Sequence, residues 1–284
     1  MVLSIVPRVF RASSSSKSTK NCAQLITDSE IKAKAVLRSA IVEQHAGRMN
    51  EALRIHTDYA PLFQKINNQT LKGSYHNDLG DVLVYLWESE GPTAYLHRAL
   101  DEYDAASYHF DQAQHRRYRA NVENNLGCLY YKIHLCKEAH GHLDRARRIF
   151  TSLKDKAAIA QVDETRARVF LQEGRNAEAE KVVRSSVRTL EKTDMPSLLA
   201  QSLATHGTAL ARMGNYGVAL AAFRRAIALS QQTGNLNRAA QTALSVFQEM
   251  GDRLSASVRR TLIARRTLND EIQALEHELI KTCA

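Results

Sequence analysis

Small and large apolar residues recur at a fixed interval along this 284-residue chain. In each copy a small residue is followed four positions later by a larger one, and three positions after that by another small one. The four copies follow one another at a step of 40: Ala99/Tyr103/Ala106, Ala139/Leu143/Ala146, Ala179/Val183/Ser186 and Ala219/Phe223/Ala226. Offsets of four and three place side chains on one face of a helix. The pattern therefore predicts four equivalent helices, with weaker copies at Ala52 and Ala256.

A partner helix is predicted before three of these helices. The pairs Leu126-Gly127, Arg166-Ala167 and His206-Gly207 begin at one constant distance upstream of Ala139, Ala179 and Ala219. The small residue lets a neighbouring helix approach, and the bulky residue three positions later is expected to fill the remaining space.

Glycines mark the predicted turns between paired helices. Gly47, Gly174 and Gly214 lie where a helix ends, and glycine readily adopts the positive φ that such an end requires. His134 takes this place in one pair. A single pair cannot close a core, so the pairs are expected to stack.

These marks resemble the tetratricopeptide repeat. The residues that carry the resemblance are Leu126-Gly127, Tyr130, Ala139 and Ala146 in one unit and Gly207, Gly214-Asn-Tyr, Ala219, Phe223 and Ala226 in another. The resemblance implies an all-α fold, a right-handed solenoid of antiparallel helix pairs. The family's usual period is about 34 residues. The longer step of this chain predicts lengthened helices, similar to those of bacterial regulatory and scaffold proteins and of kinesin light chains.

The pattern predicts four segments along the chain. Residues 1–27 form a disordered basic leader, 28–115 divergent helical repeats, 116–250 well-defined repeats, and 251–284 capping helices. The unit from Leu79-Gly80 to Ala99 is longer than the others and contains Trp87 and the turn Gly91-Pro92.

Both ends allow two interpretations. The leader is basic and Ser-rich, with no acid before Asp28, which is typical of an organelle transit peptide but also of an unstructured or misassigned start. Near the other end, Leu268, Ile272, Leu275 and Leu279 form an apolar stripe. The stripe predicts a helix that caps the last repeat, or a short coiled coil that makes a homodimer.

Charge and composition narrow the function classes. The net charge is +9, but part of it lies in the leader, so the charge is weak evidence for nucleic-acid binding. Aromatic residues are only 6%, which argues against binding of single-stranded nucleic acid. No apolar run is long enough to span a membrane. The four cysteines show no CxxC pair and are typical of reduced thiols, so we expect a cytoplasmic protein.

No motif predicts catalysis or a cofactor. GxGxxG, GxxxxGK[ST], HExxH and GxSxG are all absent. A metal-like group, His134, Cys136, His140 and His142, is open to two interpretations, a zinc or copper site and ordinary helix-surface residues. His142 lies off the face that Cys136 and His140 would share, which favours the second, so we predict no metal, no cofactor and no enzyme.

The resemblance implies a working surface. In tetratricopeptide proteins the first helix of each pair lines a concave groove that binds a peptide or helix. Carried onto this chain, three rows result: Asp78, Asn125, Thr165 and Thr205; Asp81, Cys128, Arg168 and Thr208; and Lys132, Gln172 and Arg212, flanked by Tyr131. We select Asp78, Asp81, Asn125, Cys128, Tyr131, Arg168 and Arg212 as the groove residues.

Two functions follow from this surface. The first is a protein–protein interaction scaffold, in which the Asn125 amide pairs with ligand backbone and the change from acidic to basic residues selects a partner of opposite charge polarity. The second is the sensor or regulatory module of a bacterial signalling or transcriptional system.

Overall fold

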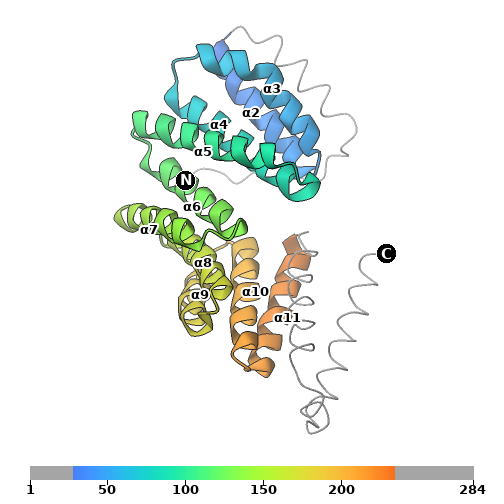
Figure 1. Ribbon diagram of the computed structural model, residues 1–284, viewed down its shortest axis with the longest axis vertical. Helices are drawn as coiled ribbons and strands as arrows, with labels where there is room; N and C mark the ends of the chain where they lie inside the picture. Colours follow the sequence, from blue (N-terminus) through green and yellow to red (C-terminus); the bar gives the residue numbers. More distant parts are fainter. Residues whose placement is uncertain (1–27, 234–284) are drawn as a thin grey trace. The chain divides into compact units, whose positions relative to one another are not determined.

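The computed structural model describes residues 28–233, which fold into α-helices joined by short turns (Figure 1). No strand occurs within this range. The predicted all-α fold is confirmed. None of the described helices is long and apolar enough to cross a membrane. The helices are α2 (Ser29–His45), α3 (Met49–Lys65), α4 (Gln69–Glu90), α5 (Thr93–Gln112), α6 (Arg116–Lys132), α7 (Cys136–Ser152), α8 (Lys156–Gln172), α9 (Asn176–Leu190), α10 (Pro196–Arg212) and α11 (Tyr216–Thr233).

The helices from α6 onward start at a regular step of 20. Their first residues are Arg116, Cys136, Lys156, Asn176, Pro196 and Tyr216. Pairs of helices therefore recur at the step of 40 that the sequence predicts. α6, α7, α8 and α10 are each 17 residues long, and only short turns remain between neighbours. The expected lengthening of the helices is confirmed.

Most of the turns between helices contain one residue with positive φ. A residue with positive φ recurs at Gln114, His134, Lys154, Gly174 and Gly214, with φ of 52, 63, 56, 76 and 83°. The predicted role of His134 in place of glycine is confirmed. The left-handed conformation costs free energy in a residue with a Cβ. Gln114, His134 and Lys154 adopt it nevertheless, so the tight turn is kept even where glycine is absent.

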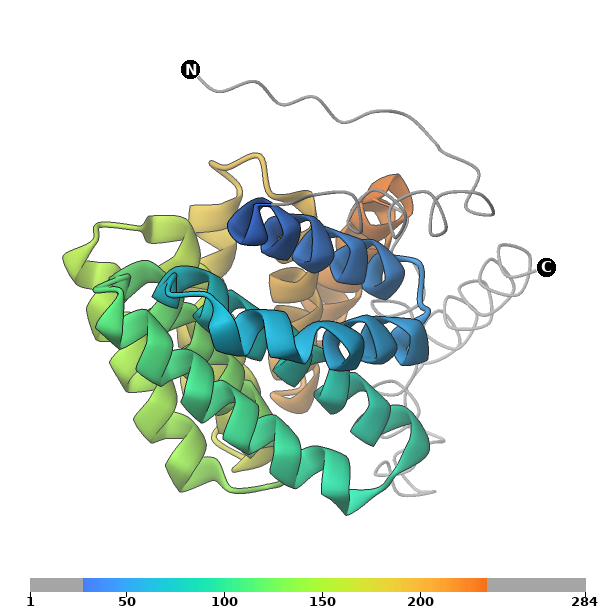
Figure 2. The same cartoon turned by 90° about the horizontal axis from the view of Figure 1, so that it is seen from above.

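The helices α4 and α5 are longer than the other described helices, as the longer unit from Leu79-Gly80 to Ala99 predicts. α4 has 22 residues and α5 has 20. Gly91 ends α4 with φ 87°, and Pro92 is the N-cap of α5. Neighbouring helices of this part of the chain pack together, and the view from above shows them side by side (Figure 2).

The chain divides into two compact units, residues 1–129 and 130–284. Of the described residues, α2 to α5 and most of α6 belong to the N-terminal unit, and the end of α6 and α7 to α11 belong to the C-terminal unit. The domain boundaries proposed from the sequence stay predictions. The leader, the copy at Ala256 and the apolar stripe at 268–279 lie outside the described residues.

The four small-large-small triplets all lie in the core. Their twelve side chains are at most 3% exposed. In the weaker copy, Ala52 and His56 are both 0% exposed. Burial lowers the pKa of His56 to about 4, so this imidazole is neutral in the folded protein. The periodic pattern therefore marks the buried face of each second helix.

In two of the triplets the large residue lies against a glycine of the partner helix. A Cβ added to Gly207 would lie 2.9 Å from the ring of Phe223, and one added to Gly80 would lie 2.7 Å from the ring of Tyr103. The sequence predicts that Leu210, three positions after Gly207, fills this space. The ring of Phe223, from the second helix, lies against Gly207, and Leu210 is also buried, at 7% exposed, so the role of Leu210 stays a prediction.

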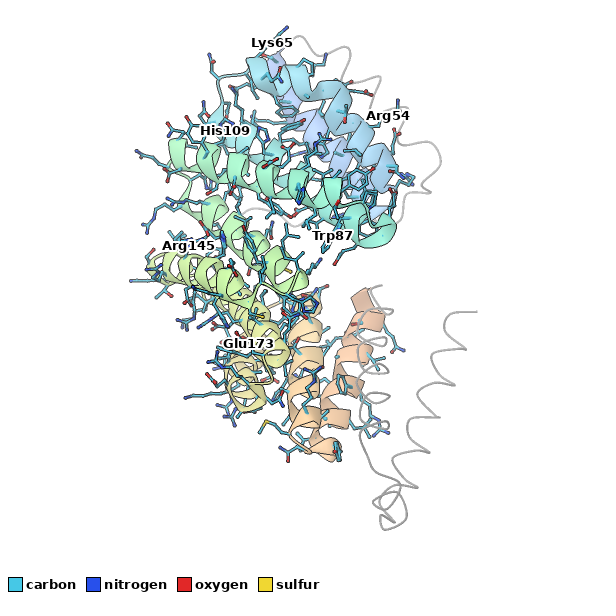
Figure 3. The ribbon with its side chains drawn as sticks, in the orientation of Figure 1. Arg54, Lys65, Trp87, His109, Arg145 and Glu173 are labelled. Carbon is cyan, nitrogen blue, oxygen red and sulfur yellow. The ribbon has the colours of Figure 1, made fainter. Side chains whose placement is uncertain are left out.

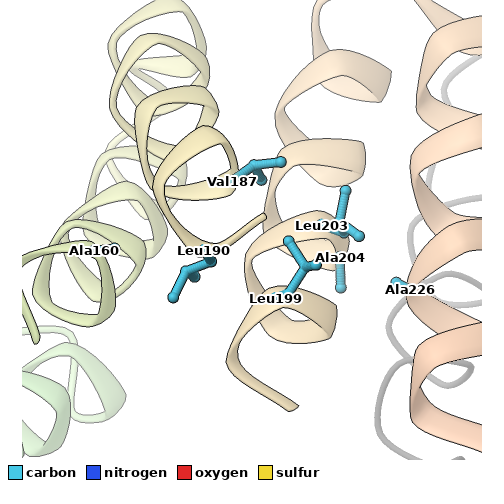
Figure 4. Packing of buried hydrophobic residues seen from close by; sticks show 7 residues of the cluster. All are labelled: Ala160, Val187, Leu190, Leu199, Leu203, Ala204 and Ala226. Carbon is cyan, nitrogen blue, oxygen red and sulfur yellow. The ribbon is translucent and has the colours of Figure 1, made fainter. Parts of the chain in front are cut away.

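Successive pairs join through an apolar cluster in the C-terminal unit. It combines residues of α8, α9, α10 and α11: Ala160, Val187, Leu190, Leu199, Leu203, Ala204 and Ala226 (Figure 4). Leu190 and Ala226 are fully buried. The cluster shows the stacking of pairs that the repeat predicts.

Replacing Gly207 with alanine is expected to destabilise the protein. The new methyl would lie 2.9 Å from the ring of Phe223, which is 0% exposed, so the ring would have to shift within the core. We expect a loss of about 1–3 kcal/mol, as for other overpacked cores, measured by urea unfolding followed by circular dichroism.

Gly141→Ala is the matched control. Gly141 also lies within a helix, but a Cβ there would meet only the side chain of Arg145, at 3.7 Å. Alanine should raise stability by about 0.5–1 kcal/mol through its better helix propensity. Equal effects of the two substitutions would contradict the packing account.

Candidate partner-binding faces

The seven predicted groove residues fall into two groups, one in each unit. Asp78, Asp81, Asn125 and Cys128 belong to the N-terminal unit, and Tyr131, Arg168 and Arg212 to the C-terminal unit. Each group is described within its own unit.

In the N-terminal unit a hydrogen-bond network centres on Asp81. Its Oδ1 accepts from the Tyr103 hydroxyl at 2.6 Å and from Asn125 Nδ2 at 3.2 Å. Asn125 Nδ2 also donates to Asn77 Oδ1 at 3.1 Å. The structure therefore brings Asp81 and Asn125 together, and α4 fixes the orientation of the Asn125 amide.

Asp78 is a half-buried carboxyl one helical turn before Asp81. Burial, with a smaller effect of the nearby Asp81 charge, raises the pKa of Asp78 to about 7. Asn77 Nδ2 donates to Asp78 Oδ1 at 3.4 Å, which opposes the rise only in part. Near neutral pH the carboxyl of Asp78 is therefore partly protonated.

Cys128 is half-buried on α6. A thiolate there would raise the pKa of Tyr103 further, but burial of Tyr103 has the largest effect and Asp81 the next. Tyr103 is therefore a neutral hydrogen-bond donor to Asp81.

In the C-terminal unit the predicted arginines are held by their own chain. The Arg168 guanidinium lies over the Tyr131 ring, 5.5 Å from its centroid, and Arg168 Nε lies 3.1 Å from Glu164 Oε1. Arg212 Nη1 donates to the backbone carbonyl of Leu171 at 2.8 Å. The structure thus brings Tyr131 and Arg168 together, and it attaches Arg212 of α10 to the end of α8.

Glu164 joins α8 to α10. This side chain is buried, and its Oε1 accepts a hydrogen bond from Thr205 Oγ1 at 2.7 Å. Ionic and hydroxyl partners together stabilise a carboxylate that burial would otherwise disfavour.

Three further residues of the expected rows are not available to a partner. Thr165, Thr205 and Thr208 are 2%, 6% and 7% exposed. Neighbouring helices cover the middle of the expected face, so these three threonines pack against other residues of the chain.

Three exposed residues of the first helices were not among the predicted groove residues. Gln161 and Gln201 are exposed in the first halves of α8 and α10, and Gln201 is the one exposed residue in α10. Gln161 lies two helical turns before Arg168 on α8, so the two share a helix face. Asn121 is exposed at the matching position of α6 in the N-terminal unit. Their step of 40 is the signal that could have found them.

The metal-like histidines and cysteine do not converge. Cys136 Sγ donates to Gln172 Oε1 at 3.2 Å, and Gln172 Nε2 lies 2.8 Å from His134 Nδ1. Glu173 lies just after α8 (Figure 3). His140 Nε2 lies 3.2 Å from Glu173 Oε2, and His142 stacks on Tyr130 with ring centroids 5.0 Å apart. Within residues 28–233, no three His, Cys, Asp or Glu side chains are placed to hold a metal.

Comparisons with known proteins identify the fold. A Rap protein complexed with Competence and Sporulation Factor matches with a TM-score of 0.67 and 12% identity over 94% of this chain and 80% of that one. BtubC from P. vanneervenii matches at 0.59 and 15% over 78% and 88%. A putative kinesin light chain with TPR-like repeats from Podosopora anserina matches at 0.54 and 14% over 73% and 99%. No family model and no curated protein matches the sequence.

Asp78→Asn is expected to change how stability depends on pH. Folding raises the pKa of Asp78 from 3.8 to about 7, so the folded protein holds a proton that the unfolded chain releases between these values. The stability that this carboxyl contributes is full below pH 3.8 and is lost as the pH rises through about 7. Asparagine does not titrate. Between about pH 4 and pH 8, the free energy of unfolding of the variant should therefore rise relative to that of the wild type by about 2–4 kcal/mol.

Urea unfolding across this pH range measures the difference. Asp101→Asn is the control, because Asp101 is an exposed carboxylate of the same unit. A constant difference between Asp78→Asn and wild type at every pH would show that burial does not protonate Asp78.

Proposed function

We propose that this chain, an all-α solenoid with the fold of tetratricopeptide-repeat proteins, is a non-enzymatic interaction protein that binds a segment of a partner protein. Two proteins of this fold are known in complexes, Cut9 with Hcn1 and the Rap protein with Competence and Sporulation Factor. We place its action in the cytoplasm, where Cys128 and Cys136 stay reduced.

The exposed amides of the first helices carry the proposal. Gln161 and Gln201 point out of α8 and α10, which are otherwise packed almost along their whole length. A side-chain amide both donates and accepts, so it can pair with the backbone of an extended segment in either direction. In the C-terminal unit, Arg168 on Tyr131 and Arg212 near the other end of the same faces add positive charge.

The charged residues of each unit favour a partner segment of a different charge. On α4 of the N-terminal unit, Asp78, Asp81 and Glu88 share one face, while the C-terminal unit presents Arg168 and Arg212. Electrostatic complementarity favours a basic segment on the first face and an acidic segment on the second. Arg168 and Arg212 are pre-oriented by Glu164 and by the Leu171 carbonyl, so their side chains lose little freedom on binding.

A regulatory role is the second candidate. The fold matches a STAND protein with a tetratricopeptide repeat sensor, with a TM-score of 0.58 and 12% identity over 91% of this chain. It also matches Rap proteins. In this role the same faces would sense a peptide and pass the signal to an output partner. Release of a captured protein on adding a peptide would distinguish a sensor from a permanent scaffold.

Removing the exposed amides is expected to weaken partner binding. Affinity capture with the full chain identifies the partner, and titration then compares wild type with Gln161→Ala/Gln201→Ala. Both side chains are exposed, so the variant should fold normally and lose about tenfold or more in affinity, as central interface residues do.

The control is Lys181→Ala/Ser185→Ala on the exposed side of α9. It should bind as the wild type does. If the glutamine variant keeps full affinity, the partner does not use these faces and the proposal fails.

A further inference from the structure

A cavity of about 520 Å³ lies between α7 and α8, and arginines dominate its lining. The lining residues are Asp144, Arg147, Arg148, Thr151 and Arg166. None of the seven predicted groove residues belongs to it. Its volume is within the range of about 300–1,000 Å³ that small-ligand sites occupy.

A buried carboxylate beside the cavity orients two of the arginines. Asp163 is 8% exposed, and its Oδ1 accepts from Arg147 Nε at 2.8 Å and from Arg166 Nη1 at 3.4 Å. Arg166 Nη2 also lies 3.3 Å from Asp144. The guanidinium groups of Arg147 and Arg166 are therefore fixed before any ligand arrives.

Donors remain unused in this arrangement. Within the described residues, Arg147 contacts Asp163 through Nε, which leaves its two terminal nitrogens without a protein acceptor. Arg148 is exposed, and its Nε donates to the Asp144 backbone carbonyl at 3.3 Å, so its terminal nitrogens and its charge are not paired with a carboxylate.

The next repeat shows that the fold does not need these charges. One repeat further on, Val187 and Leu203 stand in the places of Arg147 and Asp163, within the apolar cluster between α9 and α10 (Figure 4). A buried ion pair is commonly no more stabilising than apolar residues of similar size. Packing alone therefore does not explain why this repeat carries a charged junction where the next carries an apolar one.

We propose that this cavity binds a phosphate monoester. Arg147 and Arg148 are consecutive on α7, so their side chains leave the helix in directions about 100° apart. A phosphate monoester carries close to two negative charges and three strong acceptor oxygens, so it can accept hydrogen bonds from two guanidinium groups at once, whereas a carboxylate offers one charge and two oxygens. This site lies apart from the proposed partner faces and does not depend on them.

Fluorescence anisotropy with a short labelled phosphoserine peptide tests the proposal. The full chain should bind this peptide, and the same peptide with serine or glutamate in that place should bind at least about tenfold more weakly. Unlabelled inorganic phosphate and adenosine monophosphate serve as competitors. Displacement by either one at lower concentration than the phosphopeptide identifies a small molecule as the source of the group, which still supports a phosphate site.

The repeat supplies a matched pair of variants. Arg148→Ala should weaken binding about tenfold or more. Arg188→Ala, at the equivalent exposed position of α9, should leave binding unchanged. Arg148→Lys keeps the charge but not the two-pronged donor, and its affinity should fall between wild type and Arg148→Ala.

Three outcomes would overturn the phosphate site. They are the absence of phosphopeptide binding, equal binding of the glutamate peptide, and an equal effect of Arg148→Ala and Arg188→Ala. Because Arg148 is exposed and contacts only backbone, circular dichroism should show that its variants fold as the wild type does.

Discussion

The close approach of an aromatic ring to a glycine sets the geometry of two helix pairs of this protein, α4 with α5 and α10 with α11. Phe223 on Gly207 and Tyr103 on Gly80 leave no room for a Cβ, and Phe110 on Gly73 does the same within 2.7 Å. Helices can approach so closely only where one of them lacks a side chain. The small residues that flank Tyr103 and Phe223 are 0% exposed, and the same small-large-small pattern recurs with Leu143 and Val183 as the large residue.

This tight pairing also determines where chemistry can occur. α8 and α10 are covered along most of their length, so few polar positions remain for a partner, among them Gln161 and Gln201. Two consecutive carboxylates of α8 bind different neighbouring helices, one before and one after α8 in the chain. Asp163 pairs with Arg147 of α7, and Glu164 accepts from Thr205 of α10. One helix therefore fixes its neighbours on both sides through groups that are buried and paired.

The sequence predicted the helix pairs, the glycine turns, the left-handed His134 and the longer helices around Gly91, because each depends on residues close together in the chain. It did not predict which side chains cover each other. Thr205 is buried through its contact with Glu164 of the preceding repeat, and Asn125 is held by Asp81 in the same way. Such contacts depend on how pairs stack. Comparing equivalent positions of the repeats would have revealed Gln161 and Gln201, and also the exchange of Arg147 and Asp163 for Val187 and Leu203.

A double-mutant cycle between Gly207 and Phe223 tests the central packing claim most directly. Unfolding free energies are measured for Gly207→Ala, Phe223→Leu, the double variant and the wild type. If the ring and the glycine backbone exclude each other's atoms, the smaller leucine should accommodate the new methyl, and the double variant should be more stable than the sum of the two effects by about 1 kcal/mol or more. Additive effects would mean that the contact between Phe223 and Gly207 does not set the approach of α10 and α11.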